Sequence, residues 1–166
     1  MASKALITPE QYLTTHFERE PELVHGELAE RPLPTFPHGN LQLRLGARLL
    51  ALQPSYAVFT GVEVRVRIAP DLIRIPDISM WSGPEQPPAL PTTPPLLVVE
   101  ISSPDDRLHD LLQRFEEYRA WGVRNIWLVE PELKRCHIYE SGSLTEVSRF
   151  TLPQFNLEIA AAELFV

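Results

Sequence analysis

Cysteine and long apolar runs are almost absent from this 166-residue sequence. The single cysteine, Cys136, excludes an internal disulfide framework and is typical of a protein from a reducing compartment. No apolar stretch approaches the roughly 20 residues that cross a bilayer, and the start MASKALITPE lacks the pattern of a signal peptide. We therefore expect a soluble, cytoplasmic protein with no membrane partner.

Basic residues are also scarce. Lys and Arg number 15 against 22 Asp and Glu, which gives a formal net charge of -7 at pH 7. This balance argues against a protein that coats nucleic acid through bulk electrostatic attraction, so any contact with nucleic acid must be local. The arginines of VEVRVRIAPDLIRIPD could make such contacts, although a solvated strand face is the simpler interpretation of them.

Internal repeats, a phosphate-binding glycine loop and a cysteine-histidine zinc spacing are absent as well. What the chain does contain is 44% hydrophobic residues over a length that suits one core. We expect a single domain over residues 1–166.

Proline and glycine residues mark the boundaries of the helices and strands expected in the first half of the chain. A short helix should follow Thr8, and the segment PELVHGELAERP should form a hairpin that turns near His25. A leucine-rich helix follows, in which Leu41, Leu45, Leu49 and Leu52 share one face. The strict alternation of VEVRVRI then predicts one half-buried strand over 62–68.

The second half predicts a strand, a helix and a strand. Six prolines make 84–95 a stiff loop, and PLLVVEIS reads as a strand buried on both faces. Ser103 and Asp106 resemble a capping box that opens a helix ending at Gly122. Because a right-handed crossover would join the strand of PLLVVEIS to NIWLVEP, we expect those two strands to be parallel in a mixed sheet.

Two carboxylates stand out in this arrangement. Glu100 interrupts the apolar strand, where a glutamate is costly unless a positive group meets it. Asp77 ends the stretch LIRIPD, points to its apolar side, and follows a proline that should weaken strand pairing there. Two carboxylates that converge from adjacent strands are typical of hydrolytic Mg²⁺ sites.

The segments HGELAE, IPDISM, LLVVEISSP and RLHDLLQRFEEYRAWGVRNIWLVEPE resemble the Uma-type restriction endonuclease family, within the PD-(D/E)XK nuclease superfamily. The resemblance covers nearly the whole chain. It implies an α/β (α+β) restriction endonuclease-like fold, with a mixed central β-sheet flanked by α-helices. It also implies a metal-dependent endonuclease that hydrolyses phosphodiester bonds of nucleic acid, with DNA as the favoured substrate and Mg²⁺ (or Mn²⁺) as cofactor.

Site residues follow from the same resemblance. Asp77 and Glu100 would bind the metal with the carbonyl of Ile101, and Glu27 matches an acidic residue in an early strand. The superfamily usually has a lysine two residues after the second acid, where this chain has Ser102; the Uma-type family has it in the next helix, at Arg114. The residues expected around this group are His38, Ser102 and Asp110.

Arginine at position 114 changes the expected chemistry. Because a guanidinium stays protonated, Arg114 cannot be a general base, but it can stabilise charge on a phosphate. Purely structural roles remain open for these residues. Glu100 and Arg114 could form a structural salt bridge, Asp77 could be an ordinary aspartate at a strand end, and Arg114 could form a surface ion pair with Asp110.

Three functions therefore remain open for the whole protein. The first is a metal-dependent nuclease. The second is a catalytically degenerate nuclease-fold protein that acts as a nucleic-acid-binding or regulatory module. The third is a protein unrelated to nucleic acid that dimerises through its sheet edges. A homodimer is expected by analogy with enzymes that cut both strands of a duplex.

Overall fold

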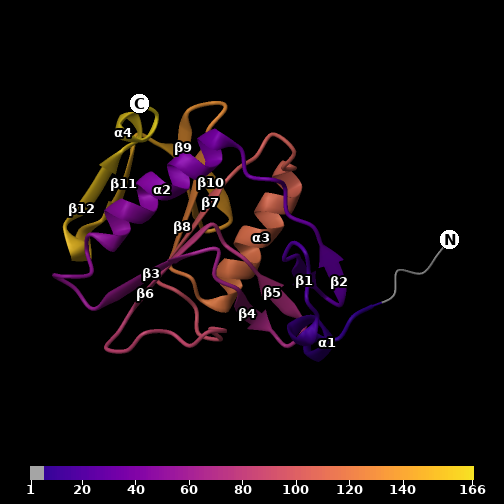
Figure 1. Cartoon of the computed structure of the whole chain (residues 1–166). Coiled ribbons are helices and arrows are strands. Elements are labelled where there is room, and N and C mark those ends of the chain that lie inside the picture. Colours follow the sequence, from indigo (N-terminus) through magenta and orange to yellow (C-terminus); the bar gives the residue numbers. More distant parts are fainter. Residues whose placement is uncertain (1–5) are drawn as a thin grey trace.

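A six-stranded mixed β-sheet runs through the centre of the molecule, with α2 and α3 beside it (Figure 1). The structure is a computed structural model that describes residues 6–166. The strands lie in the order β10-β9-β8-β7-β6-β3. Their bounds are β3 Val58–Val62, β6 Ile78–Ser82, β7 Leu97–Ile101, β8 Asn125–Glu130, β9 Arg135–Glu140 and β10 Ser143–Val147.

Smaller elements surround this sheet. A four-stranded antiparallel sheet has the order β2-β1-β5-β4, and β11 pairs with β12. Their bounds are β1 Glu22–Val24, β2 Glu27–Ala29, β4 Val66–Ala69, β5 Leu72–Arg74, β11 Arg149–Leu152 and β12 Leu157–Ala160. The helices are α1 Pro9–Thr14, α2 Phe36–Leu50, α3 Leu108–Trp121 and α4 Ala161–Leu164, with a 3₁₀ turn η1 at Pro153–Phe155. Among residues 6–166, no helix combines the length and the apolar character that crossing a bilayer requires.

Strand β7 and strand β8 are parallel and are joined through α3, as the crossover argument predicts. Alternation along β7 divides its side chains between two cores. Leu97, Val99 and Ile101 pack in the cluster that contains the buried leucines of α2, whereas Val98 packs with Phe115 of α3. Glu100 has the parity of Val98, so its side chain points to the α3 side of the sheet.

The expected hairpin and leucine-rich helix are both present. Strands β1 and β2 pair across His25 and Gly26, both at positive φ. Leu41, Leu45 and Leu49 are buried on α2.

The single strand predicted over 62–68 is wrong, because it is broken in the middle. Strand β3 ends at Val62, which is 53% exposed, and β4 begins only at Val66. Glu63 lies between them in the left-handed region at φ 50, and its N–H donates to the carbonyl of Asp77 over 3.1 Å. A second break faces the first, since β5 ends at Arg74 and β6 begins at Ile78. Asp77 lies in this second break, just after the proline that weakens pairing.

The predicted capping box before α3 is also wrong. The helix begins at Leu108, and its N-cap residue Arg107 makes no capping hydrogen bond through its side chain. The carboxylate of Asp106 instead accepts from the N–H of Ser103 at 2.7 Å, within a turn that precedes the helix. The end of the helix is as expected, because Gly122 takes the left-handed conformation that a C-terminal cap favours.

Candidate active site

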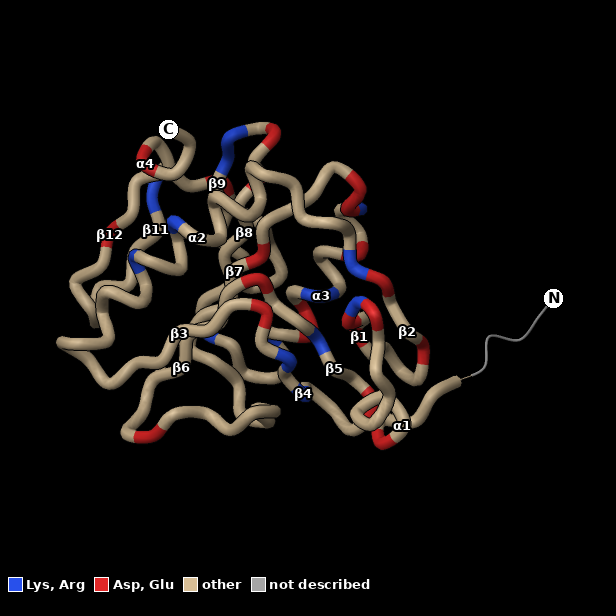
Figure 2. Tube along the Cα trace, viewed as in Figure 1, with Lys and Arg blue, Asp and Glu red and all other residues tan. Residues whose placement is uncertain are grey.

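A cavity of about 280 Å³ opens where the two strand breaks meet the carboxyl end of β7 and the side of α3. Its lining comes from separate parts of the chain: Arg19, Glu20, Arg31, Pro32, Leu33, Pro34, His38, Glu63, Asp77, Glu100, Ile101, Ser103, Asp106, Leu111 and Arg114. We call this space the cleft. Acidic and basic positions both occur along the chain where β1, β5, β7 and α3 come together (Figure 2).

Asp77 is 4% exposed and is held by contacts with β7 and α2. Its Oδ2 accepts from the N–H of Ile101 at 2.7 Å and lies 3.3 Å from Nε2 of His38. Its backbone carbonyl accepts from the side chain of Gln42 at 2.9 Å. The hydrogen bond to the Asp77 carboxylate raises the pKa of His38 above its usual value, although burial opposes this. These contacts hold the carboxylate at the cleft.

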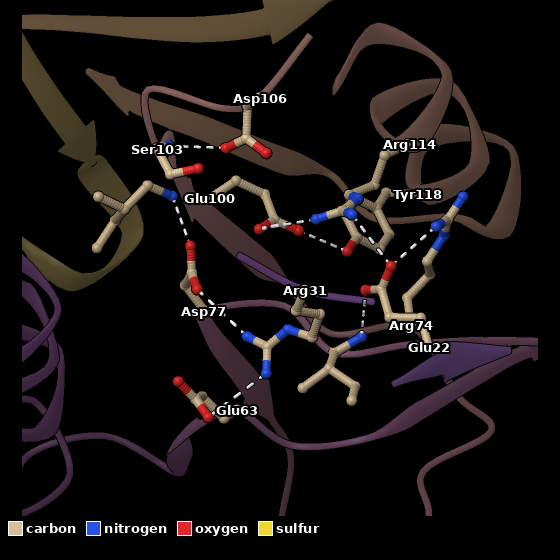
Figure 3. A network of polar contacts seen from close by, with 12 residues as sticks. Glu22, Arg31, Glu63, Arg74, Asp77, Glu100, Ser103, Asp106, Arg114 and Tyr118 are labelled. Atoms are coloured by element: carbon tan, nitrogen blue, oxygen red, sulfur yellow. Dashed lines mark hydrogen bonds and ion pairs between the residues drawn. The ribbon is translucent and has the colours of Figure 1, made fainter. Parts of the chain in front are cut away.

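Glu100 is 3% exposed and has a partner for each carboxylate oxygen (Figure 3). Tyr118 of α3 donates its hydroxyl to Oε1 at 2.6 Å, and Arg114 NH1 lies 3.5 Å from Oε2. Burial raises the pKa of Glu100 to about 7, and the nearby charges of Asp77 and Glu22 also raise it, while Arg114 and Tyr118 oppose the rise. Arg114 is thus the positive group that offsets the buried charge of Glu100.

Glu22, at the start of β1, links α3 to β5. Its Oε2 accepts from Arg114 at 3.0 Å and from Arg74 at 2.9 Å, and its Oε1 accepts from the N–H of Ile75 at 2.9 Å. Glu22 is 1% exposed. Burial tends to lower the pKa of Arg114, but the charges of Glu100 and Glu22 outweigh it and raise that pKa. Arg114 is therefore held as a cation between two buried carboxylates.

Arg31 lies near the other carboxylate oxygen of Asp77, the one that does not bond to Ile101. Its NH2 lies 3.6 Å from Asp77 Oδ1, and its NH1 lies 3.5 Å from Glu63 Oε2 (Figure 3). Arg31 comes from the irregular segment between β2 and α2. Each of the two carboxylates thus has its own guanidinium, Arg31 beside Asp77 and Arg114 beside Glu100.

With this geometry in place, the comparisons with known proteins decide the family. Residues 9–162 match the Uma2 family, described as "Putative restriction endonuclease". The chain belongs to this family. A crystal structure of a putative nuclease of the DUF820 group, from Anabaena variabilis, superimposes with a TM-score of 0.85 at 20% identity, covering 96% of this chain and 97% of that one. No curated protein matches the chain.

These matches confirm two predictions from the sequence. The resemblance to the Uma-type family is confirmed by the family match, and the restriction endonuclease-like fold by the structural match. The description of the family as putative restriction endonucleases implies a nucleic-acid substrate and, in general, a divalent metal cofactor.

Five of the predicted site residues lie at the cleft. These are His38, Asp77, Glu100, Ile101 and Arg114. They come from α2 (His38), the break between β5 and β6 (Asp77), β7 (Glu100 and Ile101) and α3 (Arg114). The surface pair of Arg114 with Asp110 is not formed, because the ion pairs of Arg114 run to Glu22 and Glu100.

The other three predicted residues are not part of the cleft lining. Glu27 lies on an exposed part of β2, and Asp110 lies on the exposed side of the first turn of α3. Ser102 is half-buried and bonds through its N–H to the carbonyl of Val129 at 2.9 Å. Ser103 and Asp106 line the cleft instead.

Four residues of this site were missed: Glu22, Arg31, Glu63 and Tyr118. Glu22 had a signal like that of Glu100, because it stands beside Leu23 at the start of a short apolar strand. Tyr118 shares the buried face of α3 with Leu111 and Phe115, so its spacing indicates only a residue of the core. Arg31 and Glu63 lie in irregular segments and had no signal in the periodicity of the sequence.

The donor chemistry of the cleft fits a hard divalent cation. The carboxylates of Asp77 and Glu100 supply oxygen ligands of the type that Mg²⁺ prefers, and Mg²⁺ keeps several waters when proteins bind it. Within residues 6–166, no group of three or more His, Cys, Asp and Glu side chains is arranged as a metal site, so backbone oxygen and water would complete the coordination. Nδ1 of His38, Oγ of Ser103 and Nε of Arg114 are buried at the cleft without hydrogen-bond partners among the described residues. Buried polar atoms of this kind are uncommon and often mark functional sites.

Proposed function

We propose that this protein is a divalent-metal-dependent endonuclease that hydrolyses phosphodiester bonds of nucleic acid, with DNA as its substrate. The observation that carries the proposal is the pair of buried carboxylates, Asp77 and Glu100, which reach one cleft from the break before β6 and from β7. Membership of the Uma2 family supports the same chemistry. Asp77 and Glu100 would hold Mg²⁺ or Mn²⁺, together with the carbonyl of Ile101.

The bound metal would lower the pKa of a water and offset negative charge on the phosphate. The protein's own residues prepare the site for this. The N–H of Ile101 orients Asp77, and the hydroxyl of Tyr118 orients Glu100. Arg114 stays protonated, so it stabilises negative charge on the phosphate and does not take a proton from water.

Arginine at position 114 favours a second candidate function. In this alternative the protein keeps the fold and binds nucleic acid or regulates another protein, but has lost turnover. The supporting observation is that the guanidinium of Arg114 is tied to Glu22 and Glu100, where the family resemblance implies a lysine. Replacing Arg114 with lysine separates the two: a large gain of cleavage indicates a weakened nuclease site, and no gain favours the non-catalytic role.

The central test uses Asp77→Asn, with Asp71→Asn as a matched control. Asp71 is an exposed aspartate in the turn before β5, paired with His25 outside the cleft. Cleavage of plasmid and single-stranded substrates is measured with Mn²⁺, and metal binding is measured by calorimetry. We expect Asp77→Asn to lose both cleavage and metal binding, and Asp71→Asn to retain both. Undiminished cleavage by Asp77→Asn would refute the assignment.

A homodimer would allow two clefts to act on one duplex, and it remains a prediction for this protein. Light scattering on the purified chain measures it directly. A monomer that nicks only one strand would remove the dimer from the proposal and leave the cleft chemistry standing.

A further inference from the structure

Arg31 stands beside the carboxylate that the proposed metal would need. Its side chain is 17% exposed, and its guanidinium spans Asp77 and Glu63 at 3.6 and 3.5 Å. The contact with Glu63 is a long hydrogen bond, whereas the contact with Asp77 is an ion pair beyond hydrogen-bond distance. Arg31 is therefore attracted to these carboxylates by charge without being locked to either by a short, directional bond.

The two oxygens of Asp77 have different surroundings. Oδ2 is occupied by the N–H of Ile101 at 2.7 Å and lies near His38. Oδ1 lies beside the guanidinium of Arg31. A cation that binds Asp77 without disturbing the bond between the strands must therefore approach Oδ1, where the guanidinium now lies.

Glu63 is a second carboxylate partner for Arg31. The break between β3 and β4 brings Glu63 beside Asp77, because the Glu63 N–H bonds to the Asp77 carbonyl. The Glu63 side chain is 45% exposed, far more than the 6% of Asp77. A guanidinium that leaves Asp77 can thus keep a carboxylate partner nearer to solvent.

We propose that Arg31 is a built-in counter-ion of the metal site. It neutralises Asp77 when no ion is bound, and it must withdraw toward Glu63 before a divalent ion can bind. The inference rests on the proposed function, since it presumes that Asp77 is a metal ligand. Arg31 is accordingly a residue that sets how tightly the cleft takes a divalent ion, and its effect is on metal affinity.

The test measures Mn²⁺ binding by calorimetry on the full chain, for the wild type and for Arg31→Gln, Arg31→Lys and Arg65→Gln. Arg65 is the matched control: its NH1 pairs with Glu20 at 2.9 Å, and it does not line the cleft. We expect Arg31→Gln to bind Mn²⁺ about tenfold more tightly, equivalent to about 1.4 kcal/mol. Arg31→Lys keeps the charge, and Arg65→Gln removes a charge that is 39% exposed, screened by solvent and paired with Glu20, so both should stay within about twofold of the wild type.

Each outcome bears on the inference. Equal affinity of wild type and Arg31→Gln, with binding lost in Asp77→Asn, would overturn the inference and leave the proposed function intact. An equal gain in Arg65→Gln or in Arg31→Lys would also overturn it, because net charge or side-chain shape would then be the cause. Absence of Mn²⁺ binding in every protein would refute the metal site itself, and the inference with it.

Discussion

Removal of Glu22 tests the charge network that supports the cleft. This carboxylate is 1% exposed and receives hydrogen bonds from Arg74, Arg114 and the N–H of Ile75. The variant Glu22→Ala deletes all three acceptor contacts at once. It leaves two largely buried guanidinium groups with less negative charge around them.

The expected cost follows from the partners that remain. Breaking a buried ion pair by removing one member costs about 3–5 kcal/mol, since the other charge stays buried. Arg74 keeps Glu117 at 2.7 Å, and Arg114 keeps Glu100 at 3.5 Å. Because each arginine retains one carboxylate, we expect a loss near the lower end, about 3 kcal/mol in the free energy of unfolding.

Urea unfolding at equilibrium measures this loss, with Glu20→Ala as the control. The Glu20–Arg65 pair has the same 2.9 Å separation as the Glu22–Arg74 pair, but its side chains are 36% and 39% exposed. Exposed pairs contribute about 0–1 kcal/mol. If Glu22→Ala costs no more than Glu20→Ala at an unchanged denaturant slope, the buried network contributes no more to the stability of the fold than an exposed ion pair does.

Two further predictions concern pH and glycine. Burial raises the pKa of Glu100 from 4.5 to about 7, so between these values the folded state holds a proton that the unfolded state has released, and stability falls as pH rises. In the presence of EDTA, the melting temperature of Glu100→Gln should fall less across this window than that of the wild type; an equal fall contradicts the cause. Gly122→Ala should destabilise by about 1 kcal/mol, because φ is +116° and the new Cβ would lie 3.3 Å from Pro94. Gly39→Ala, inside α2 with open space around it, should stabilise by about 0.5–1 kcal/mol, and melting shifts of the same sign would refute the contrast.

Local periodicity predicted the parts of the fold that depend on local signals. The buried leucines of α2 have the helical spacing of Leu41, Leu45 and Leu49, and the apolar run around Glu100 is a central strand, as its composition indicates. The parallel pairing of β7 and β8 followed from handedness and from the length of the crossover. These features need no knowledge of distant residues.

The strand break at Glu63 could not be predicted in the same way. The segment VEVRVRI alternates without a fault, so its period indicates one strand. The break lies at Glu63, whose φ of 50 is in the left-handed region and whose N–H bonds to the carbonyl of Asp77, a residue outside the segment. The prediction for the start of α3 was also wrong. Asp106 has the right spacing for a capping box, but it bonds to the N–H of Ser103 in a turn that precedes the helix.

The residues of the candidate site also divide into those with a local signal in the sequence and those placed only by distant contacts. Asp77 and Glu100 were found because each breaks a local rule, a carboxylate on the apolar side of a strand. Arg31 breaks no local rule, because it lies in a proline-rich segment where an arginine needs no explanation. Its contact with Asp77 exists only once the segment between β2 and α2 passes over the cleft.

The identity of residue 114 connects stability with catalysis. The two terminal nitrogens of Arg114 reach different carboxylates, NH2 to Glu22 and NH1 to Glu100, which come from the two separate sheets. A lysine carries one compact ammonium and has no planar fork, so it cannot reproduce both contacts in this geometry. Arg114→Lys should therefore loosen the link between the sheets even if it raises cleavage. A gain of activity with a lower melting temperature would indicate that this chain uses arginine to stabilise the cleft where the family resemblance implies a catalytic lysine.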